Sequence, residues 1–176
     1  DLVARNIGWR QPGHWLQKLF ITPLREAGRG LRQYNPASRA RSNVAHHYDL
    51  TGALYDLFLD SDRQYSCAYF QGSEDNLDAA QLRKKQHLAA KLKLQPGQRV
   101  LDIGSGWGGM GLHLAKQHQV MVHGVTLSEE QHKVSNKRAR EAGLGGFVTF
   151  DLQDYREVEG PFDRIISVGM FEHVGV

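Results

Sequence analysis

A glycine-rich string at residues 102–109 is the part of the sequence that most clearly indicates binding chemistry. It reads Asp-Ile-Gly-Ser-Gly-Trp-Gly-Gly and follows an apolar run that is typical of a strand. Glycines in a strand-to-helix turn let a ligand approach the backbone, and the helix N-terminus offers free N–H groups. The alternative is a turn that needs glycine only for its backbone angles.

Two nucleotide-type ligands compete for this turn. NAD requires an acidic residue at the end of the second strand, about 20 residues further on, whereas Thr126-Leu127-Ser128 stands there. Asp102, before the first glycine, fits the DxGxGxG form used for S-adenosylmethionine. The sequence therefore favours a methyl donor, with Asp102, Gly104 and Gly106 as candidate cofactor-binding residues.

A second polar group follows the next apolar run. Ser128 and Gln131 fit a capping box, in which the serine accepts from the third helical N–H and the glutamine side chain bonds back to the serine N–H. Thr126, Ser128 and Gln131 would also line the crevice at the carboxyl ends of parallel strands, where such sheets bind ligands. Both roles are compatible, because the cap lies beside the crevice.

One further residue is a candidate for chemistry by its position, and the single cysteine by itself is typical of a small buried thiol. Glu172 comes just after an apolar strand, which is a usual position for a functional carboxylate; the alternative is a charge interaction at a helix start. Cys67 is the single cysteine, so no internal disulfide can form and a reducing, cytoplasmic compartment is expected. Histidine, cysteine and carboxylate residues do not fall at metal-ligand spacing, and we predict no metal site.

Alternating strands and helices must position these residues. Short apolar runs separated by amphipathic segments predict an α/β fold with a doubly wound parallel sheet. The expected elements are a short helix around 51–59, a helix over Leu77–Leu94 capped by Asn76, strands at Arg99–Ile103, Val120–Val125, Phe147–Asp151 and Asp163–Val168, and helices at Met110–Gln117 and Glu129–Ala142.

Length and charge limit the classes of protein. The 176 residues are 40% hydrophobic, enough for a core, and no apolar run reaches the roughly 18 residues of a membrane span. Residues 1–43 hold eight basic side chains against two acidic ones, a net charge of +6, whereas the remainder carries −3. This basic end, with apolar residues between its charges, suits either an anionic membrane surface or nucleic acid. The alternative is a helix packed on the protein with its charges in water.

Several motifs in order resemble the cyclopropane-fatty-acid synthase family, which includes the mycolic acid cyclopropane synthases. The resemblance covers residues 44–176, and residues 1–43 match only loosely. Ser105 is a departure, since the family commonly has cysteine there. The matching strings are HYDL at 47–50, YSCAYF at 65–70, VLDIGSGWGG at 100–109, VTLS at 125–128 with Gln131, QDY at 153–155 and FDRIISVGMFEHVG at 162–175.

The resemblance implies a class I, Rossmann-like S-adenosylmethionine-dependent methyltransferase that acts on the double bonds of unsaturated phospholipid acyl chains. A carbocation forms, and loss of a proton closes a cyclopropane ring. Such a site needs a dry apolar slot, aromatic faces and a base. By the same resemblance, a bicarbonate ion is the base, Cys67 and Glu172 help to hold it, and Tyr155 flanks the adenine. The implied cofactor contacts are Tyr65, Ser66, Gly104, Gly106, Thr126, Ser128 and Gln131.

The resemblance also implies an organisation into parts. These are a basic segment at 1–43, a helical cap at 44–95, and the first half of a methyltransferase domain at 96–176, cut after the fourth strand. We expect the 176 residues alone to be inactive and to keep weak cofactor affinity. For the intact protein the resemblance favours a peripheral location on the inner membrane face and lipid rather than nucleic acid as partner; the oligomeric state is left open, with a homodimer as the candidate. Open alternatives are a relative that leaves a methyl branch and a non-catalytic remnant that binds cofactor or lipid.

Overall fold

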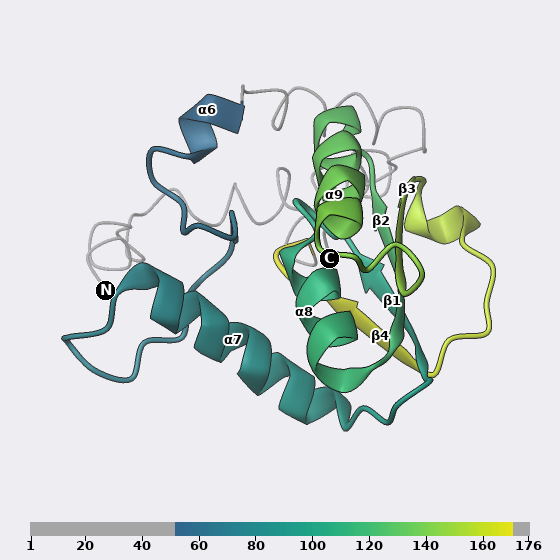
Figure 1. Ribbon diagram of the computed structural model, residues 1–176, viewed down its shortest axis with the longest axis horizontal. Coiled ribbons are helices and arrows are strands. Elements are labelled where there is room, and N and C mark those ends of the chain that lie inside the picture. The colour runs from purple at the N-terminus through teal and green to yellow at the C-terminus, as the bar shows by residue number, and fades with distance from the viewer. Residues whose placement is uncertain (1–51, 171–176) are drawn as a thin grey trace, which may run out of the picture. The chain divides into compact units, whose positions relative to one another are not determined.

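The computed structural model describes residues 52–170 of the chain. Four parallel strands form its sheet, in the order β3-β2-β1-β4. Two helices that connect consecutive strands, α8 and α9, lie on the same face of that sheet (Figure 1). The strands are β1 (Arg99–Ile103), β2 (Met121–Thr126), β3 (Val148–Leu152) and β4 (Arg164–Ser167), and the helices are α6 (Gly52–Tyr55), α7 (Leu77–Leu92), α8 (Gly109–His118) and α9 (Glu129–Glu141), with a 3-10 helix η2 at Tyr155–Glu157.

The predicted α/β fold with a parallel sheet is confirmed. Buried and exposed residues alternate along β3, whereas β1 buries the consecutive residues Val100, Leu101 and Asp102; one face of the sheet packs against α8 and α9. Val100, Val122 and Phe150 are each at most 2% exposed there. Leu114 and Val120 complete the same core. Burial of large aliphatic and aromatic side chains in this layer is the main stabilising contribution to the sheet.

Three glycines make room for Phe150. A Cβ on Gly108 would lie 2.8 Å from the Phe150 Cζ, and a Cβ on Gly124 would lie 2.5 Å from its Cδ1. A Cβ on Gly111 would lie 3.3 Å from the Phe150 Cζ. Part of the glycine content of the turn and of β2 therefore serves packing rather than ligand binding.

Two local predictions need correction. The helix expected around 51–59 ends as an α-helix at Tyr55, and the chain continues in turns. Its apolar spacing was misleading, since Leu57 is 81% and Phe58 50% exposed and neither anchors a helix to the core. The capping box at α9 is only half formed. Ser128 Oγ accepts from Gln131 N, but the Gln131 side chain accepts from Thr126 Oγ1 at 2.9 Å, and Ser128 N–H donates to Thr126 Oγ1 instead.

Candidate functional site

The glycine turn joins β1 to α8 with left-handed backbone at three positions. Gly104, Gly106 and Gly108 have φ of 73°, 55° and 85°, which residues with a Cβ rarely adopt. The N–H groups of Gly104 and Ser105 both donate to Val125 O, at 2.9 and 3.0 Å, and so tie the turn to the end of β2. A Cβ on Gly106 would meet nothing nearer than Gly104 O at 4.0 Å. The turn is thus rigid on its inner side and open at Gly106.

Asp102 is a buried carboxylate that has no counter-charge among residues 52–170. Its side chain is 2% exposed, and Oδ2 has no hydrogen-bond partner within the described residues. Burial alone raises the pKa of Asp102 from 3.8 to about 7, because the low-dielectric interior disfavours the charged form. A buried acceptor without a donor is costly in a folded protein and indicates a place for an external donor.

Other orphan polar atoms lie near the same end of the sheet. Ser105 Oγ, Trp107 Nε1 and Ser167 Oγ are buried and have no partner in the part of the chain that is described. Ser167 pairs in register with Ile103, so it lies beside the residue that leads into the glycine turn. Sequence reasoning missed Ser167 and Trp107, since a serine or tryptophan at a strand end or turn carries no signal of its own.

The predicted residues on β2 and after β3 lie at the same edge, where parallel strands end. Thr126, Ser128 and Gln131 are at most 6% exposed and hydrogen-bond one another. Tyr155 begins η2 and is 38% exposed. The hydrogen bonds establish the capping role of Ser128, while contact of these four residues with a ligand stays a prediction.

Tyr65 and Ser66 reach this edge from outside the sheet. A Cβ on Gly169, just after β4, would lie 3.6 Å from Ser66 Cβ and 3.7 Å from Tyr65 O. A Cβ on Gly104 would lie 3.2 Å from Met170 Cβ. The loop after β4 therefore lies between the glycine turn and the segment that carries Tyr65 and Ser66.

An aromatic cluster connects that segment to the turn. The Tyr55 ring lies 5.6 Å from Tyr65 and 5.4 Å from Trp107, measured between centroids. Tyr55 and Trp107 are buried, whereas Phe58 and Tyr65 are 50% and 55% exposed. This aromatic cluster is thus part of the core on its inner side and an exposed aromatic surface on its outer side.

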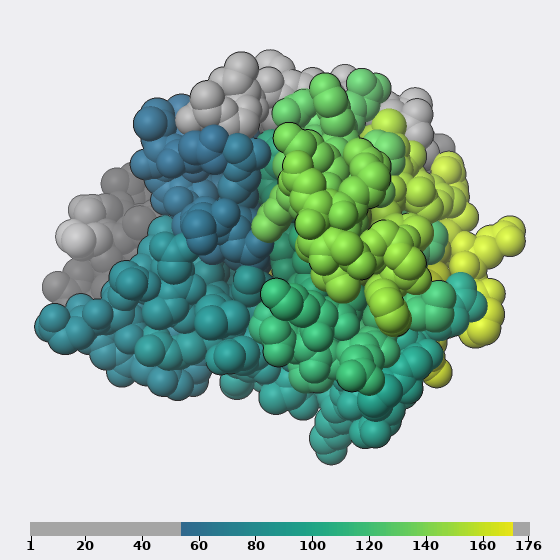
Figure 2. Space-filling view, viewed as in Figure 1, coloured from purple at the N-terminus to yellow at the C-terminus, as the bar shows by residue number. Residues whose placement is uncertain are grey.

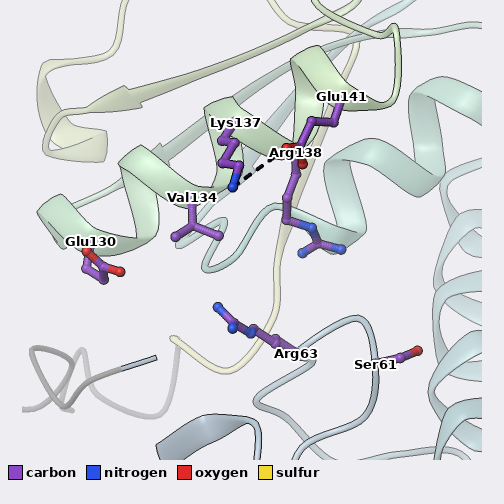
Figure 3. A pocket seen from close by; sticks show the side chains of 7 residues that line it. All are labelled: Ser61, Arg63, Glu130, Val134, Lys137, Arg138 and Glu141. Atoms are coloured by element: carbon purple, nitrogen blue, oxygen red, sulfur yellow. Dashed lines mark ion pairs between the residues drawn. The ribbon is translucent and has the colours of Figure 1, made fainter. Parts of the chain in front are cut away.

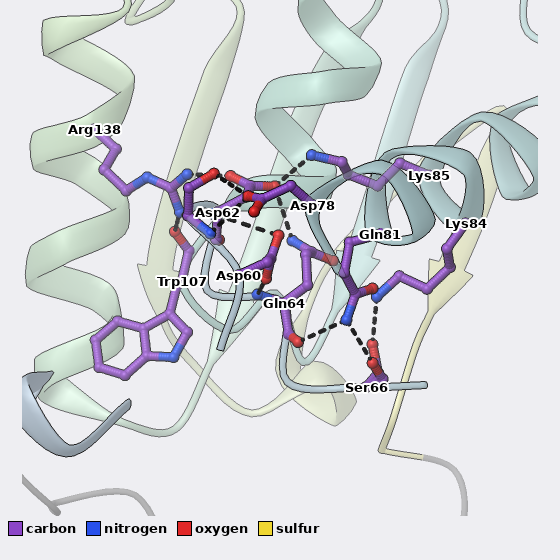
Figure 4. Close-up of polar contacts among 11 residues, drawn as sticks. Asp60, Asp62, Gln64, Ser66, Asp78, Gln81, Lys84, Lys85, Trp107 and Arg138 are labelled. Atoms are coloured by element: carbon purple, nitrogen blue, oxygen red, sulfur yellow. Dashed lines mark hydrogen bonds and ion pairs between the residues drawn. The ribbon is translucent and has the colours of Figure 1, made fainter. Parts of the chain in front are cut away.

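A set of ionic contacts, unforeseen from the sequence, holds residues 60–66 in place (Figure 4). The Asp62 carboxylate accepts from both Lys85 of α7 and Arg138 of α9, and Arg138 Nη1 also donates to Trp107 O at 2.7 Å. We call Asp62, Lys85 and Arg138 the Asp62 clamp. Figure 2 shows the segment from residue 52 onward beside α9, and the ion pair between Asp62 and Arg138 joins the two. A Cβ on Gly109 would overlap Asp62 Oδ2, so a glycine there lets the segment approach the start of α8.

A cavity of about 370 Å³ opens between this segment and α9 (Figure 3). Its cations already have partners: Arg63 binds Asp56 at 2.7 Å, Lys137 faces Glu141 at 3.7 Å, and Arg138 belongs to the Asp62 clamp. No predicted site residue lines it; the lining residues are Ser61, Arg63, Glu130, Val134, Lys137, Arg138 and Glu141.

Of the two predicted catalytic residues, Cys67 lies within the described residues and Glu172 does not. Cys67 is exposed and directly follows Ser66. Glu172 lies outside the described residues, as does the basic segment 1–43. Within residues 52–170 no group of three or more His, Cys, Asp and Glu side chains could hold a metal ion.

Comparison with known proteins places this arrangement in a family. The family model described as mycolic acid cyclopropane synthetase matches residues 36–176. A cyclopropane-fatty-acyl-phospholipid synthase of Escherichia coli K12 is 48% identical over 158 residues, covering 89% of this chain and 40% of that protein. A probable fatty acid methyltransferase of Pseudomonas putida is 46% identical over 134 residues, covering 75% of this chain and 34% of its own length.

Solved structures agree. The cyclopropane synthase MmaA2 of Mycobacterium tuberculosis superimposes with a TM-score of 0.75 at 37% identity, over 81% of this chain and 49% of that one. The mycolic acid cyclopropane synthase CmaA1, in a complex with SAH and CTAB, gives a TM-score of 0.74 at 35% identity, over 80% of this chain and 48% of that one. The chain spans less than half the length of each of these relatives. The resemblance in the motifs is therefore confirmed, and the chain belongs to the mycolic acid cyclopropane synthetase family.

Proposed function

We propose that the whole protein transfers a one-carbon unit from S-adenosylmethionine to the double bond of unsaturated phospholipid acyl chains and so forms cyclopropane fatty acids. The observation that carries the proposal is the glycine turn with the buried Asp102, whose Oδ2 has no hydrogen-bond partner in the described residues, in a chain of this family. The Escherichia coli relative is named for this activity, and the CmaA1 structure holds SAH, the demethylated cofactor.

The residues present fit such a cofactor. Asp102 offers an acceptor in a buried place, and Gly106 leaves open space beside the backbone. When bound, S-adenosylmethionine supplies an electrophilic methyl group. The chain's own part is to bind and orient it, and we assign that part to Asp102, Gly104 and Gly106 together with Tyr65, Ser66, Thr126, Ser128, Gln131 and Tyr155.

The surface that would receive the acyl chain is apolar and aromatic. Phe58 and Tyr65 form its exposed part in the described residues, with Tyr55 and Trp107 beneath. Aromatic faces stabilise positive charge, and an apolar slot excludes water that would quench it. Cys67, an exposed residue two positions after Tyr65, and Glu172 are proposed to hold a bicarbonate ion that removes the proton.

The charge of residues 1–43 supports a proposal for the location of the protein. We propose that residues 1–43 bring it to an anionic phospholipid surface on the cytoplasmic side, supported by their net charge of +6. Among the helices between residues 52 and 170, none combines the length and the apolar character that a membrane crossing needs. A homodimer stays a proposal.

Product analysis tests the proposal. The whole protein is incubated with methyl-labelled S-adenosylmethionine and vesicles of unsaturated phosphatidylglycerol, and the released fatty acids are examined by mass spectrometry and NMR. We expect label in a cyclopropane ring. Label in a methyl branch would favour the second candidate, a fatty acid C-methyltransferase, which the Pseudomonas relative supports. Absence of label from lipid under conditions where the cofactor binds would contradict both.

A mutation separates the base from the cofactor site. Glu172→Gln is expected to cripple ring closure in the whole protein while leaving cofactor affinity nearly unchanged, since the residue is assigned to the ion and not to the cofactor. A large loss of affinity in calorimetry would contradict that assignment.

A further inference from the structure

Lys84 is a lysine whose ammonium group lies inside the protein. It belongs to α7, is 7% exposed, and its Nζ donates to Ser66 Oγ at 2.7 Å (Figure 4). A burial of this kind costs free energy, so a lysine at a helix position with no partner in α7 calls for a physical reason.

The hydrogen bond has a fixed direction. An ammonium group has three donors and no acceptor, so Ser66 Oγ must be the acceptor and its own hydrogen must point elsewhere. Within the described residues no acceptor for that hydrogen is found. Lys84 thus makes Ser66 a donor toward whatever lies on its other side.

The backbone around Ser66 is held as firmly as its hydroxyl. Gln81 of α7 donates through Nε2 to Gln64 O at 3.1 Å and to Ser66 O at 2.9 Å. These two bonds fix the chain on both sides of Tyr65. Because Ser66 also adjoins Gly169 beyond β4, its hydroxyl lies near the edge where the glycine turn opens.

We propose that Lys84 is a positioning residue that turns the Ser66 hydroxyl into a donor for the carboxylate of the cofactor's amino acid part. The inference rests on the proposed function, because it takes S-adenosylmethionine as the ligand at this edge. A carboxylate is the fitting class of acceptor: hydrogen bonds to a charged group are stronger than neutral ones, and the nearby ammonium adds a favourable charge interaction.

The arrangement depends on pH. Burial lowers the pKa of Lys84 from 10.5 to about 8; Lys85 of the same helix acts in the same direction, and the charge interactions with Asp60, Asp62 and Cys67 oppose it. Above that pH the amine is neutral and gains a lone pair that can accept a hydrogen bond, so Ser66 is no longer forced to donate outward. The carboxylate then loses both the nearby positive charge and a donor of fixed direction.

The test compares two ligands that differ only in the carboxylate. S-adenosylhomocysteine and its decarboxylated analogue, which keeps the amine, are titrated calorimetrically into the unsubstituted chain, Lys84→Met and Lys84→Arg. We expect the unsubstituted chain to prefer S-adenosylhomocysteine by about tenfold near pH 7, a typical value for one charge-assisted hydrogen bond. Lys84→Met should lose most of this preference, and Lys84→Arg should keep it.

The pH dependence of this preference distinguishes the proposed role from a purely structural one, because a purely structural role of Lys84 would not change the preference with pH. In the unsubstituted chain the preference should fall several-fold between about pH 7 and about pH 9, while Lys84→Arg, whose guanidinium stays charged, should show a flat profile. The amines of the two ligands differ in pKa, because only one ligand carries the carboxylate, so the Lys84→Arg profile with the same two ligands is the control for their titration. Because the profile of the unsubstituted chain needs no substitution, it can be measured even where Lys84→Met fails to fold.

The outcomes separate the two proposals. Tight binding of S-adenosylhomocysteine with a preference that neither Lys84→Met nor pH changes would overturn the role of Lys84 and leave the proposed function intact. No binding of either ligand to the unsubstituted chain would overturn both.

Discussion

Asp102→Asn is expected to stabilise the ligand-free chain, although it removes a residue of the candidate site. Burial raises the pKa of Asp102 from 3.8 to about 7, and one pKa unit corresponds to about 1.4 kcal/mol. The charged carboxylate therefore costs the folded state up to about 4 kcal/mol above pH 7. Asparagine has nearly the same shape and no charge, but its amide must also be buried, so we expect a gain of about 2–3 kcal/mol.

The sign of the pH dependence follows from the raised pKa. Below about pH 4 the carboxyl is protonated in both folded and unfolded chains, so the charge contributes no difference. As pH rises to about 7 the unfolded chain releases its proton first, and the folded chain loses stability relative to the variant. The advantage of Asp102→Asn should therefore grow between about pH 4 and about pH 7 and then level off.

Urea unfolding followed by circular dichroism at several pH values measures this advantage. Glu159→Gln, which changes an exposed acid between η2 and β4, is the matched control and should show little change at any pH. The same Asp102→Asn protein should bind S-adenosylhomocysteine more weakly, because the buried negative charge is lost. An advantage that is absent, or that does not vary with pH, would refute the view that Asp102 is a desolvated acid without a partner.

Two substitutions and one titration test the contacts and the packing around the site. Asp62→Asn should destabilise the chain by about 1–3 kcal/mol in urea unfolding, since Lys85 and Arg138 lose their shared acceptor; unchanged stability would contradict the clamp. Gly124→Ala should cost about 1–3 kcal/mol by forcing Phe150 from its place, and a neutral effect would show that this ring is free to shift. His113, whose pKa burial lowers to about 4, should stay neutral by NMR down to about pH 5; a midpoint near 6.5 would show that its ring is hydrated.

Most of the fold could be predicted because its signals are local. β1 begins and ends at Arg99 and Ile103 as expected, since an apolar run there is bounded by Pro96-Gly97 and by the glycine turn. Asn76 caps α7, as predicted, by accepting from Ala79 N. Apolar spacing failed only around Leu57, where the side chains face outward and the helix is not held to a core.

The contacts that position the site could not be predicted in the same way. Asp62 and Arg138 lie 76 residues apart in the chain, and neither stands in a motif. Lys84 looks like an ordinary solvent-facing residue of a polar helix, and only the packing of residues 60–66 on α7 reveals its burial. The glycine turn was predictable because close approach and left-handed backbone restrict the residue type at each position.

Binding of S-adenosylhomocysteine to a glycine pair of variants tests the central claim most directly. Gly106 and Gly143 both have left-handed backbone and open surroundings, with φ of 55° and 68°, so alanine should cost each about 1 kcal/mol of stability. Gly106 belongs to the turn, whereas Gly143 follows the far end of α9. In calorimetry we predict saturable binding by the unsubstituted chain and by Gly143→Ala, and a loss of at least tenfold in affinity for Gly106→Ala. Equal affinities in all three proteins would contradict a cofactor site at the glycine turn.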